Sequence, residues 1–212
     1  MKYKAIFFDV DGTLFDTSEG IYDTFKYVFK RFGIDAESSD PSFIGPPIST
    51  TLERFFEGVT LDEARIAFRE HYDKNGKFCA KLYDGIECVL AILKADGKRI
   101  YTATSKSEAI SEELARKFGI HRYFDRILGA DYAAGRVEKD EVLRYALNVS
   151  GEKPTDCLLI GDTRFDVQGA ETVGIDCLCA AYGFGKRSEL KGNRVVGIVD
   201  SASDIIKFLR GL

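Results

Sequence analysis

Two different patterns of apolar and polar positions follow one another along the chain. Residues 5–10 form a continuous apolar run that ends in carboxylates, which is typical of a strand buried on both faces of a parallel sheet. From Asp84 onward, short apolar runs alternate with segments of helical periodicity. The runs predict strands at 99–104, 126–129, 157–160, 175–181 and 195–199. The periodic segments predict helices at 85–96, 108–118, 139–148 and 165–173, and a last helix capped by Ser201.

The stretch between the first strand and Asp84 has helical periodicity and no convincing strand. One apolar face covers residues 21–32, with Asp16 or Thr17 as the expected N-cap and Gly33 as the stop. Further helices are expected at 61–72 and near 50–57, and the Gly- and Pro-rich segment PSFIGPPIS is expected to be a stiff loop.

Alternating strands and helices predict an α/β fold with a parallel sheet covered on both faces. The helical stretch interrupts that alternation after its first strand. We therefore predict a Rossmann-like core made of residues 1–15 and 82–212. A helical insert, residues 16–81, is expected to cap this core.

Composition and charge narrow the class of protein without changing this picture. Hydrophobic residues make up 45% of the chain and charged residues 30%, as in ordinary globular proteins. The formal net charge of −4 argues against a nucleic-acid binder, which normally presents a basic surface. No apolar run reaches the roughly 20 residues of a membrane span, and no signal peptide is visible, so we expect a soluble, cytoplasmic protein.

The cysteines and histidines carry no sign of a metal site. No CxxC pair occurs, and we expect the five cysteines to be buried, reduced, apolar residues. They are Cys79, Cys88, Cys157, Cys177 and Cys179. Neither His71 nor His121 has an acidic or cysteine partner at ligand spacing, and we expect the first to be solvated and the second to lie in a connector.

Polar side chains gather where the predicted strands end. Asp9 and Asp11 end the first strand, the triplet Thr104-Ser105-Lys106 follows the second, and Asp162 and Asp166 follow the strand at 157–160. In open α/β sheets, ligands bind at the carboxyl ends of the strands. These groups should therefore converge at one edge of the sheet.

Crowded carboxylates repel one another and raise one another's pKa unless a cation neutralises them. Oxygen ligands without histidine or cysteine favour a hard ion such as Mg²⁺. Phosphoryl transfer needs a nucleophile, a proton donor and groups that bind the phosphate oxygens. Asp9 and Asp11 can supply the first two; Thr104, helix N–H groups and a lysine can supply the third. Gly12 allows a tight turn beside the ligand.

The segment DVDGTLFDT, residues 9–17, resembles the first motif of the haloacid dehalogenase superfamily of aspartate-nucleophile phosphatases. Thr104 after an apolar strand, a lysine, and GDTRFD, which is similar to GDxxxD, follow in the order of that family. The helical insert lies where the first type of cap occurs. FIGPPIS and the triplet TSK are typical of the phosphoglycolate phosphatase-like branch, which includes phosphatases, pyrophosphatases and nucleotidases.

This resemblance implies a role for each matching residue. Asp9 becomes phosphorylated and binds Mg²⁺, while Asp11 protonates the leaving oxygen, then activates water, and binds the metal through its backbone carbonyl. Thr104 bonds the phosphoryl group and Lys139 balances the charge of Asp9 and phosphate. Asp162 binds Mg²⁺ directly, and Asp166 does so directly or through water.

The substrate is expected to be a small phosphorylated metabolite, and the protein a monomer or homodimer. Phosphoglycolate, a nucleoside monophosphate and pyrophosphate stay open as substrates. Whether Lys106 or Lys186 contacts the substrate also stays open. The candidate substrate-binding residues are Thr13, Phe43, Ile44, Gly45, Pro46, Ser105 and Lys106.

Three alternatives to a phosphatase site stay open for the same residues. An aspartate at a strand end is often only a helix N-cap, and Asp16 is expected to cap the first helix of the insert. The same scaffold could serve a phosphomutase of the β-phosphoglucomutase kind. It could also serve a non-catalytic binding or regulatory module.

Overall fold

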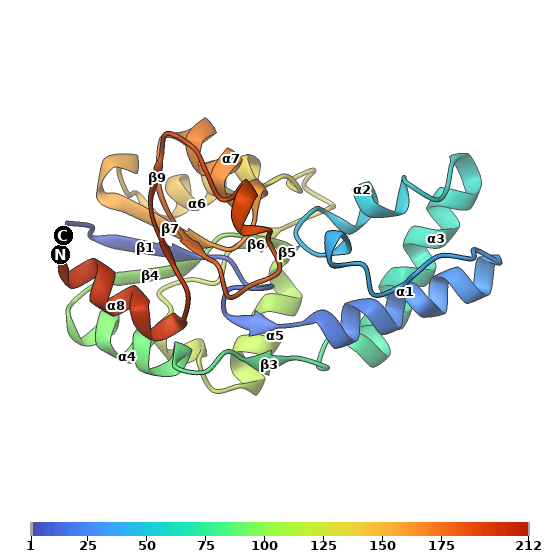
Figure 1. Ribbon diagram of the computed structural model, residues 1–212, viewed down its shortest axis with the longest axis horizontal. Helices are drawn as coiled ribbons and strands as arrows, with labels where there is room; N and C mark the ends of the chain where they lie inside the picture. The colour runs from blue at the N-terminus through green and yellow to red at the C-terminus, as the bar shows by residue number, and fades with distance from the viewer. Residues whose placement is uncertain (1, 212) are drawn as a thin grey trace.

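A central sheet of five parallel strands organises the structure, a computed structural model that describes residues 2–211 (Figure 1). The strand order is β4 (Arg99–Thr102), β1 (Ala5–Phe8), β7 (Cys157–Gly161), β8 (Asp176–Ala180) and β9 (Val195–Val199). In the register, Phe8 of β1 lies opposite Thr102 and Ile160. The three strands β4, β1 and β7 therefore end level with one another, and the residues that follow them share one edge of the sheet.

Helices cover both faces of this sheet, as Figure 1 shows. On one face lie α4 (Ile86–Ala95), α5 (Glu108–Lys117) and α8 (Ala202–Gly211); on the other lie α6 (Lys139–Ser150) and α7 (Arg164–Val173). Alternate side chains of β1 enter the two cores: Ile6 packs in the first and Phe7 in the second. The predicted α/β fold with a parallel sheet is confirmed.

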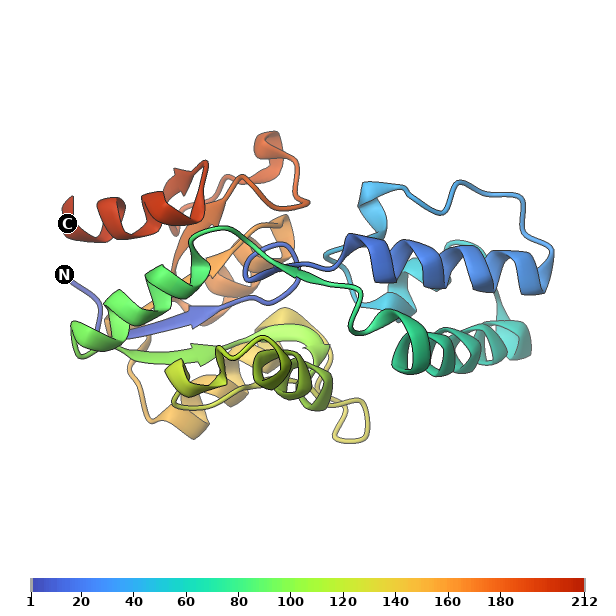
Figure 2. The same cartoon turned by 90° about the horizontal axis from the view of Figure 1, so that it is seen from below.

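The helical insert lies beyond the carboxyl ends of the strands (Figures 1 and 2). It contains α1 (Ser18–Phe32), α2 (Ile48–Leu52), α3 (Gly58–His71) and a π-helical turn, Tyr72–Gly76. These elements share a separate apolar cluster, in which the ring of Phe25 packs against Phe43 and Phe68. The chain enters and leaves the insert through two short antiparallel strands, β2 (Phe15–Asp16) and β3 (Lys81–Leu82).

The strands on the other side of β4 differ from the prediction. The expected strand at 126–129 is wrong, because only β6 (Gly129–Ala130) forms, and it pairs with β5 (Thr104–Ser107) outside the five-stranded sheet. The Thr102 hydroxyl donates to the carbonyl of Leu128 and accepts from its N–H, at 2.8 and 2.7 Å. A side chain thus takes the place of the backbone ladder there. The helix expected near 50–57 is shorter and ends at Leu52.

His121 lies in a short connector, as expected, but two other expectations are wrong: His71 is half-buried rather than solvated, and the cysteines are not all buried. Cys79 and Cys88 are exposed, whereas the other three cysteines are buried. Both histidines have acidic neighbours that are distant in sequence: His71 lies 3.2 Å from Asp23, and the His121 ring lies 2.9 Å from a carboxylate of α5. None of the helices within residues 2–211 is long and apolar enough to cross a membrane.

Candidate active site

Three carboxylates from two segments meet at the edge of the sheet. Asp9 follows β1, Asp162 follows β7, and Asp166 lies in the first turn of α7. Each offers an oxygen atom within 4.8 Å of the others, and all three residues are buried. The Asp166 Oδ2 atom also accepts from the N–H and hydroxyl of Thr163, at 2.9 and 2.8 Å, in a capping box that begins α7. The predicted convergence of these aspartates is present in the structure.

Lys139 is the first residue of α6, and its ammonium group lies between two of these carboxylates. Its Nζ atom lies 2.6 Å from Oδ1 of Asp9 and 2.7 Å from Oδ1 of Asp166, and it donates to the carbonyl of Ala103 at 3.1 Å. The side chain is only 6% exposed. The helix begins there because Glu138 and Glu141 form a capping box.

The buried charges do not balance, because one ammonium group faces three carboxylates. Burial raises the pKa of Asp9 from 3.8 to about 6, against the opposing effect of Lys139. Burial and the nearby Asp166 and Asp9 raise the pKa of Asp162 well above its ordinary value. Burial alone would lower the pKa of Lys139, but the carboxylates outweigh burial and raise it. An oxygen-only site with excess negative charge fits a divalent cation such as Mg²⁺.

Replacing Lys139 with alanine is expected to lower the free energy of unfolding of the metal-free protein by about 3–5 kcal/mol, because two buried carboxylates then lose their cation. Urea unfolding in a chelator measures this loss. Lys191→Ala, at an exposed lysine, is the matched control. A loss for Lys139→Ala within the roughly 0.5 kcal/mol that is usual for surface substitutions would contradict the assignment of this charge network.

Asp162 is fully buried and held by the loops around it. Its Oδ1 atom accepts from the Thr13 hydroxyl at 3.2 Å and its Oδ2 atom from the N–H of Phe184 at 2.8 Å. Gly12 passes so close that a Cβ atom there would collide with this carboxylate, and its φ of +81° suits glycine. The hydroxyl of Thr13, expected to bind substrate, bonds to Asp162 instead, and Thr13 does not line the cavity described below.

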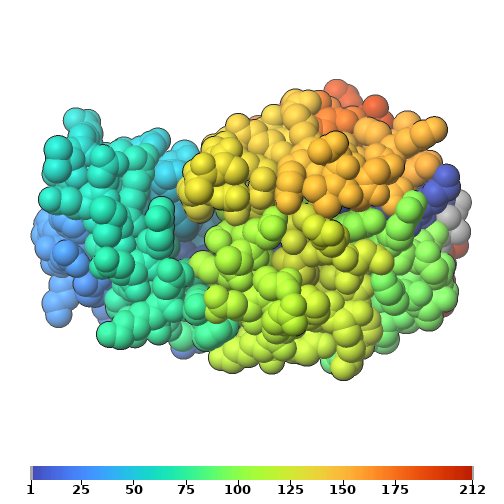
Figure 3. Space-filling view, turned by 180° about the vertical axis from the view of Figure 1, so that it is seen from behind, coloured from blue at the N-terminus to red at the C-terminus, as the bar shows by residue number. Residues whose placement is uncertain are grey.

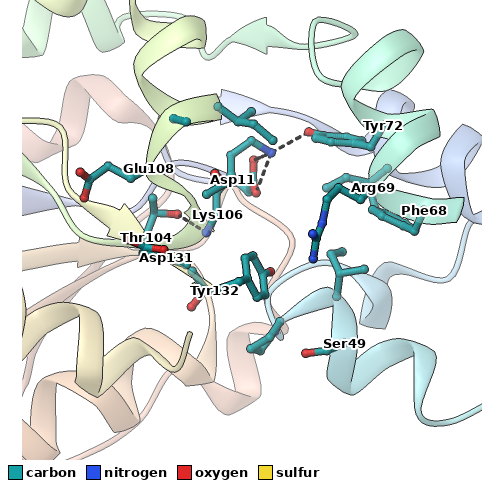
Figure 4. A pocket seen from close by; sticks show the side chains of 18 of the residues that line it. Asp11, Ser49, Phe68, Arg69, Tyr72, Thr104, Lys106, Glu108, Asp131 and Tyr132 are labelled. Atoms are coloured by element: carbon teal, nitrogen blue, oxygen red, sulfur yellow. Dashed lines mark hydrogen bonds and ion pairs between the residues drawn. The ribbon is translucent and has the colours of Figure 1, made fainter. Parts of the chain in front are cut away.

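Lys106 joins the helical insert to the core (Figure 4). Its Nζ atom lies 3.1 Å from Oδ1 of Asp11 and donates to the Tyr72 hydroxyl at 2.6 Å. Burial opposes the charge on Lys106, but Asp11 and Tyr72 raise its pKa above the ordinary value. Tyr72 is the last residue of the helix predicted at 61–72, and helical periodicity does not reveal this contact. The sequence indicates only that Tyr72 lies at the end of this helix, shortly before the chain returns to the core.

A cavity of about 990 Å³ lies between the carboxyl ends of the strands and the helical insert. Figure 3 shows the insert and the core as two masses side by side, and Figure 4 shows side chains from both pointing into the space. Lys186 is exposed and does not line it. The N-cap of α1 is Thr17, one of the two expected residues, and the carboxylate of the preceding Asp16 accepts from the N–H of Ser18. The predicted residues that line the cavity are Asp9, Asp11, Phe43, Ile44, Gly45, Pro46, Thr104, Ser105, Lys106 and Lys139.

Comparison with known proteins identifies the family. A family model described as haloacid dehalogenase-like hydrolase matches residues 6–180. The chain belongs to this family. The resemblance drawn from DVDGTLFDT is therefore confirmed.

Relatives of this haloacid dehalogenase-like hydrolase carry several names. It is 35% identical to a 5'-nucleotidase from Pseudomonas aeruginosa, over 92% of this chain and 90% of the relative. Tyrosine-protein kinase PtkA from Mycobacterium tuberculosis is also 35% identical, over 86% of this chain and 64% of that protein. A phosphoglycolate phosphatase from Aquifex aeolicus is 28% identical over 86% and 87%, which supports the expected branch. The crystal structure of a predicted phosphatase from Clostridium acetobutylicum superimposes with a TM-score of 0.94 over both whole chains at 35% identity.

Proposed function

We propose that this protein is a Mg²⁺-dependent phosphatase that hydrolyses a small phosphorylated metabolite through an aspartyl-phosphate on Asp9. The observation that carries the proposal is the cluster of Asp9, Asp162 and Asp166 around Lys139, of which Asp9 and Lys139 line a large cavity. Residues 1–15 and 82–212 would form the catalytic core, and the helical insert, residues 16–81, would be its cap. The hydrolase family and the names of its relatives support the same activity.

In the first step, a carboxylate oxygen of Asp9 attacks phosphorus and the bond from phosphorus to the leaving oxygen breaks. Lys139 holds Oδ1 of Asp9 at 2.6 Å, which orients the carboxylate for this attack. The carboxylic acid of Asp11 gives its proton to the leaving oxygen. The hydroxyl of Thr104, which lines the cavity, donates to an oxygen of the transferring phosphoryl group.

In the second step, the Asp11 carboxylate takes a proton from water, the hydroxide oxygen attacks phosphorus, and Asp9 leaves as a carboxylate. Asp9, Asp162, Asp166 and the backbone carbonyl of Asp11 would hold Mg²⁺. The ion, when bound, offsets the charge of the carboxylates and the phosphoryl oxygens.

The ion pair between Asp11 and Lys106 bears on the first step. Lys106 lies 3.1 Å from Asp11, the residue that gives its proton to the leaving oxygen in this step. An arriving phosphate offers Lys106 a second anion and, as a monoanion, carries a proton that Asp11 can accept. The proton that Asp11 passes to the leaving oxygen can therefore arrive with the substrate.

Phosphate release from p-nitrophenyl phosphate tests the proposal directly. We expect turnover with Mg²⁺ and none in excess chelator, and we expect acid quenching to trap a phosphoryl group on the peptide that contains Asp9. Mass spectrometry of the quenched protein reads out this adduct. Turnover that is unchanged in chelator would contradict the proposed Mg²⁺ dependence. A phosphoryl group on any other residue would contradict the assignment of Asp9 as the nucleophile.

A further inference from the structure

Tyr132 presents an aromatic ring to the cavity from a tightly built loop of the core. Asp131 and Arg136 exchange two backbone hydrogen bonds, at 2.7 and 2.9 Å, and the Asp131 side chain accepts from the N–H groups of Ala133 and Ala134. These bonds fix the turn that carries Tyr132. The residue is nevertheless 42% exposed and lines the cavity. An exposed ring on a fixed loop is available to a ligand.

Arg69 faces this ring from the helical insert, as Figure 4 shows. Its guanidinium carbon lies 5.6 Å from the centre of the Tyr132 ring. One helical turn further along the chain, Tyr72 contacts Lys106, which pairs with Asp11. This side of the insert therefore faces the part of the cavity where the phosphate of the substrate would bind. Arg69 and Tyr132 thus approach one another across the space between insert and core.

Arg69 differs from the other cationic residues that line the cavity. Lys106 pairs with Asp11, Lys139 pairs with two aspartates, and Arg65 pairs with Glu53 at 2.6 Å. Arg69 contacts the ring of Tyr132 and forms no ion pair with any residue in the described part of the chain. Its N–H groups are therefore available to a ligand.

Part of the remaining wall of the cavity is apolar, on the side of the helical insert. Phe43, Leu52 and Phe68 line it and are themselves packed in the cluster of the helical insert. A volume of about 990 Å³ lies at the upper end of the range for sites that take drug-sized ligands, roughly 300–1,000 Å³. A two-carbon acid such as glycolate would fill little of this space and would give the ring of Tyr132 no ligand to stack on.

We infer that Arg69 and Tyr132 form a subsite for a planar, nitrogen-rich leaving group, so that the preferred substrates are nucleoside monophosphates. This inference rests on the proposed function, because the phosphate of the substrate occupies the site around Asp9. The base stacks on the Tyr132 ring, as bases do on exposed aromatic side chains. Arg69 moves from the ring to the base, where its guanidinium stacks on the base or donates to its oxygen and nitrogen atoms.

The test compares AMP with ribose 5-phosphate, which has the same phosphate ester and no base. We expect the wild type to prefer AMP in kcat/KM. Tyr132→Ala should reduce this preference about 5- to 150-fold, the range that corresponds to one lost stacking contact, while turnover of ribose 5-phosphate is retained. Tyr132→Phe keeps the ring and should keep the preference. Tyr27→Ala is the matched control, at a similarly exposed tyrosine that does not line the cavity.

Each other outcome overturns the subsite. The inference is wrong if the wild type does not prefer AMP, or if Tyr132→Ala slows both substrates equally. It is also wrong if Arg69→Ala impairs phosphoglycolate turnover and spares AMP, because the guanidinium then serves an anion instead of a base. A different result would contradict the proposed function itself: no Mg²⁺-dependent release of phosphate from AMP, ribose 5-phosphate or p-nitrophenyl phosphate.

Discussion

Replacing Asp9 with asparagine is expected to abolish turnover of p-nitrophenyl phosphate in the presence of Mg²⁺, with a fall in kcat of about 10³-fold or more. The amide is a far weaker nucleophile than the carboxylate and cannot form the aspartyl-phosphate. The change keeps the shape of the side chain, so the hydrogen bonds of the neighbouring residues can persist. Lys139 keeps its second partner, Asp166, at 2.7 Å.

Stability separates loss of the nucleophile from loss of the fold. The pKa of Asp9 is raised to about 6 by burial, so the neutral asparagine removes a charge that the folded protein accommodates poorly. The midpoint of thermal unfolding in chelator should therefore not fall. Asp35→Asn, at an exposed aspartate, is the matched control and should keep full activity. Activity of Asp9→Asn above a tenth of the wild-type value would refute the nucleophile assignment.

The core of the site could be predicted because strand register fixes it. Asp9 and Asp162 each follow a strand of continuous apolar residues, and parallel pairing brings the ends of those strands level. The family pattern places Lys139 at the start of a helix, and the capping box of Glu138 and Glu141 begins α6 at that residue. Neither placement depends on the orientation of the helical insert.

Contacts between the insert and the core could not be predicted in the same way. Helical periodicity shows which face of α3 is apolar, but not where the helix lies relative to the sheet. Tyr72 therefore looked like a core residue, although its hydroxyl accepts from Lys106. Tyr132 lies in a short turn with no periodic pattern at all. Tyr72 and Tyr132, which both line the cavity, are thus not revealed by the sequence pattern.

The replacement of Asp162 with asparagine is expected to have opposite effects on metal binding and on the stability of the metal-free protein. Burial and the nearby Asp166 and Asp9 raise the pKa of Asp162. A group with a raised pKa in the folded state favours folding at low pH, and this contribution is lost as the pH rises through that value. At pH 8 the metal-free variant should therefore be at least as stable as the wild type, because it carries no such charge.

The same variant should lose its response to Mg²⁺ and its activity. In the wild type, Mg²⁺ at 100 times its Kd should stabilise the fold by about 2.7 kcal/mol, which raises the unfolding midpoint by about 5–10 °C for a chain of this length. Asp162→Asn should show no such rise, whereas Asp35→Asn should show all of it. An asparagine oxygen can still accept from Phe184 or Thr13, so the loops stay in place. If Asp162→Asn retained the Mg²⁺ response and the turnover, the ion would have to bind away from this cluster. The excess negative charge of the buried carboxylates would then not be the cause of Mg²⁺ binding.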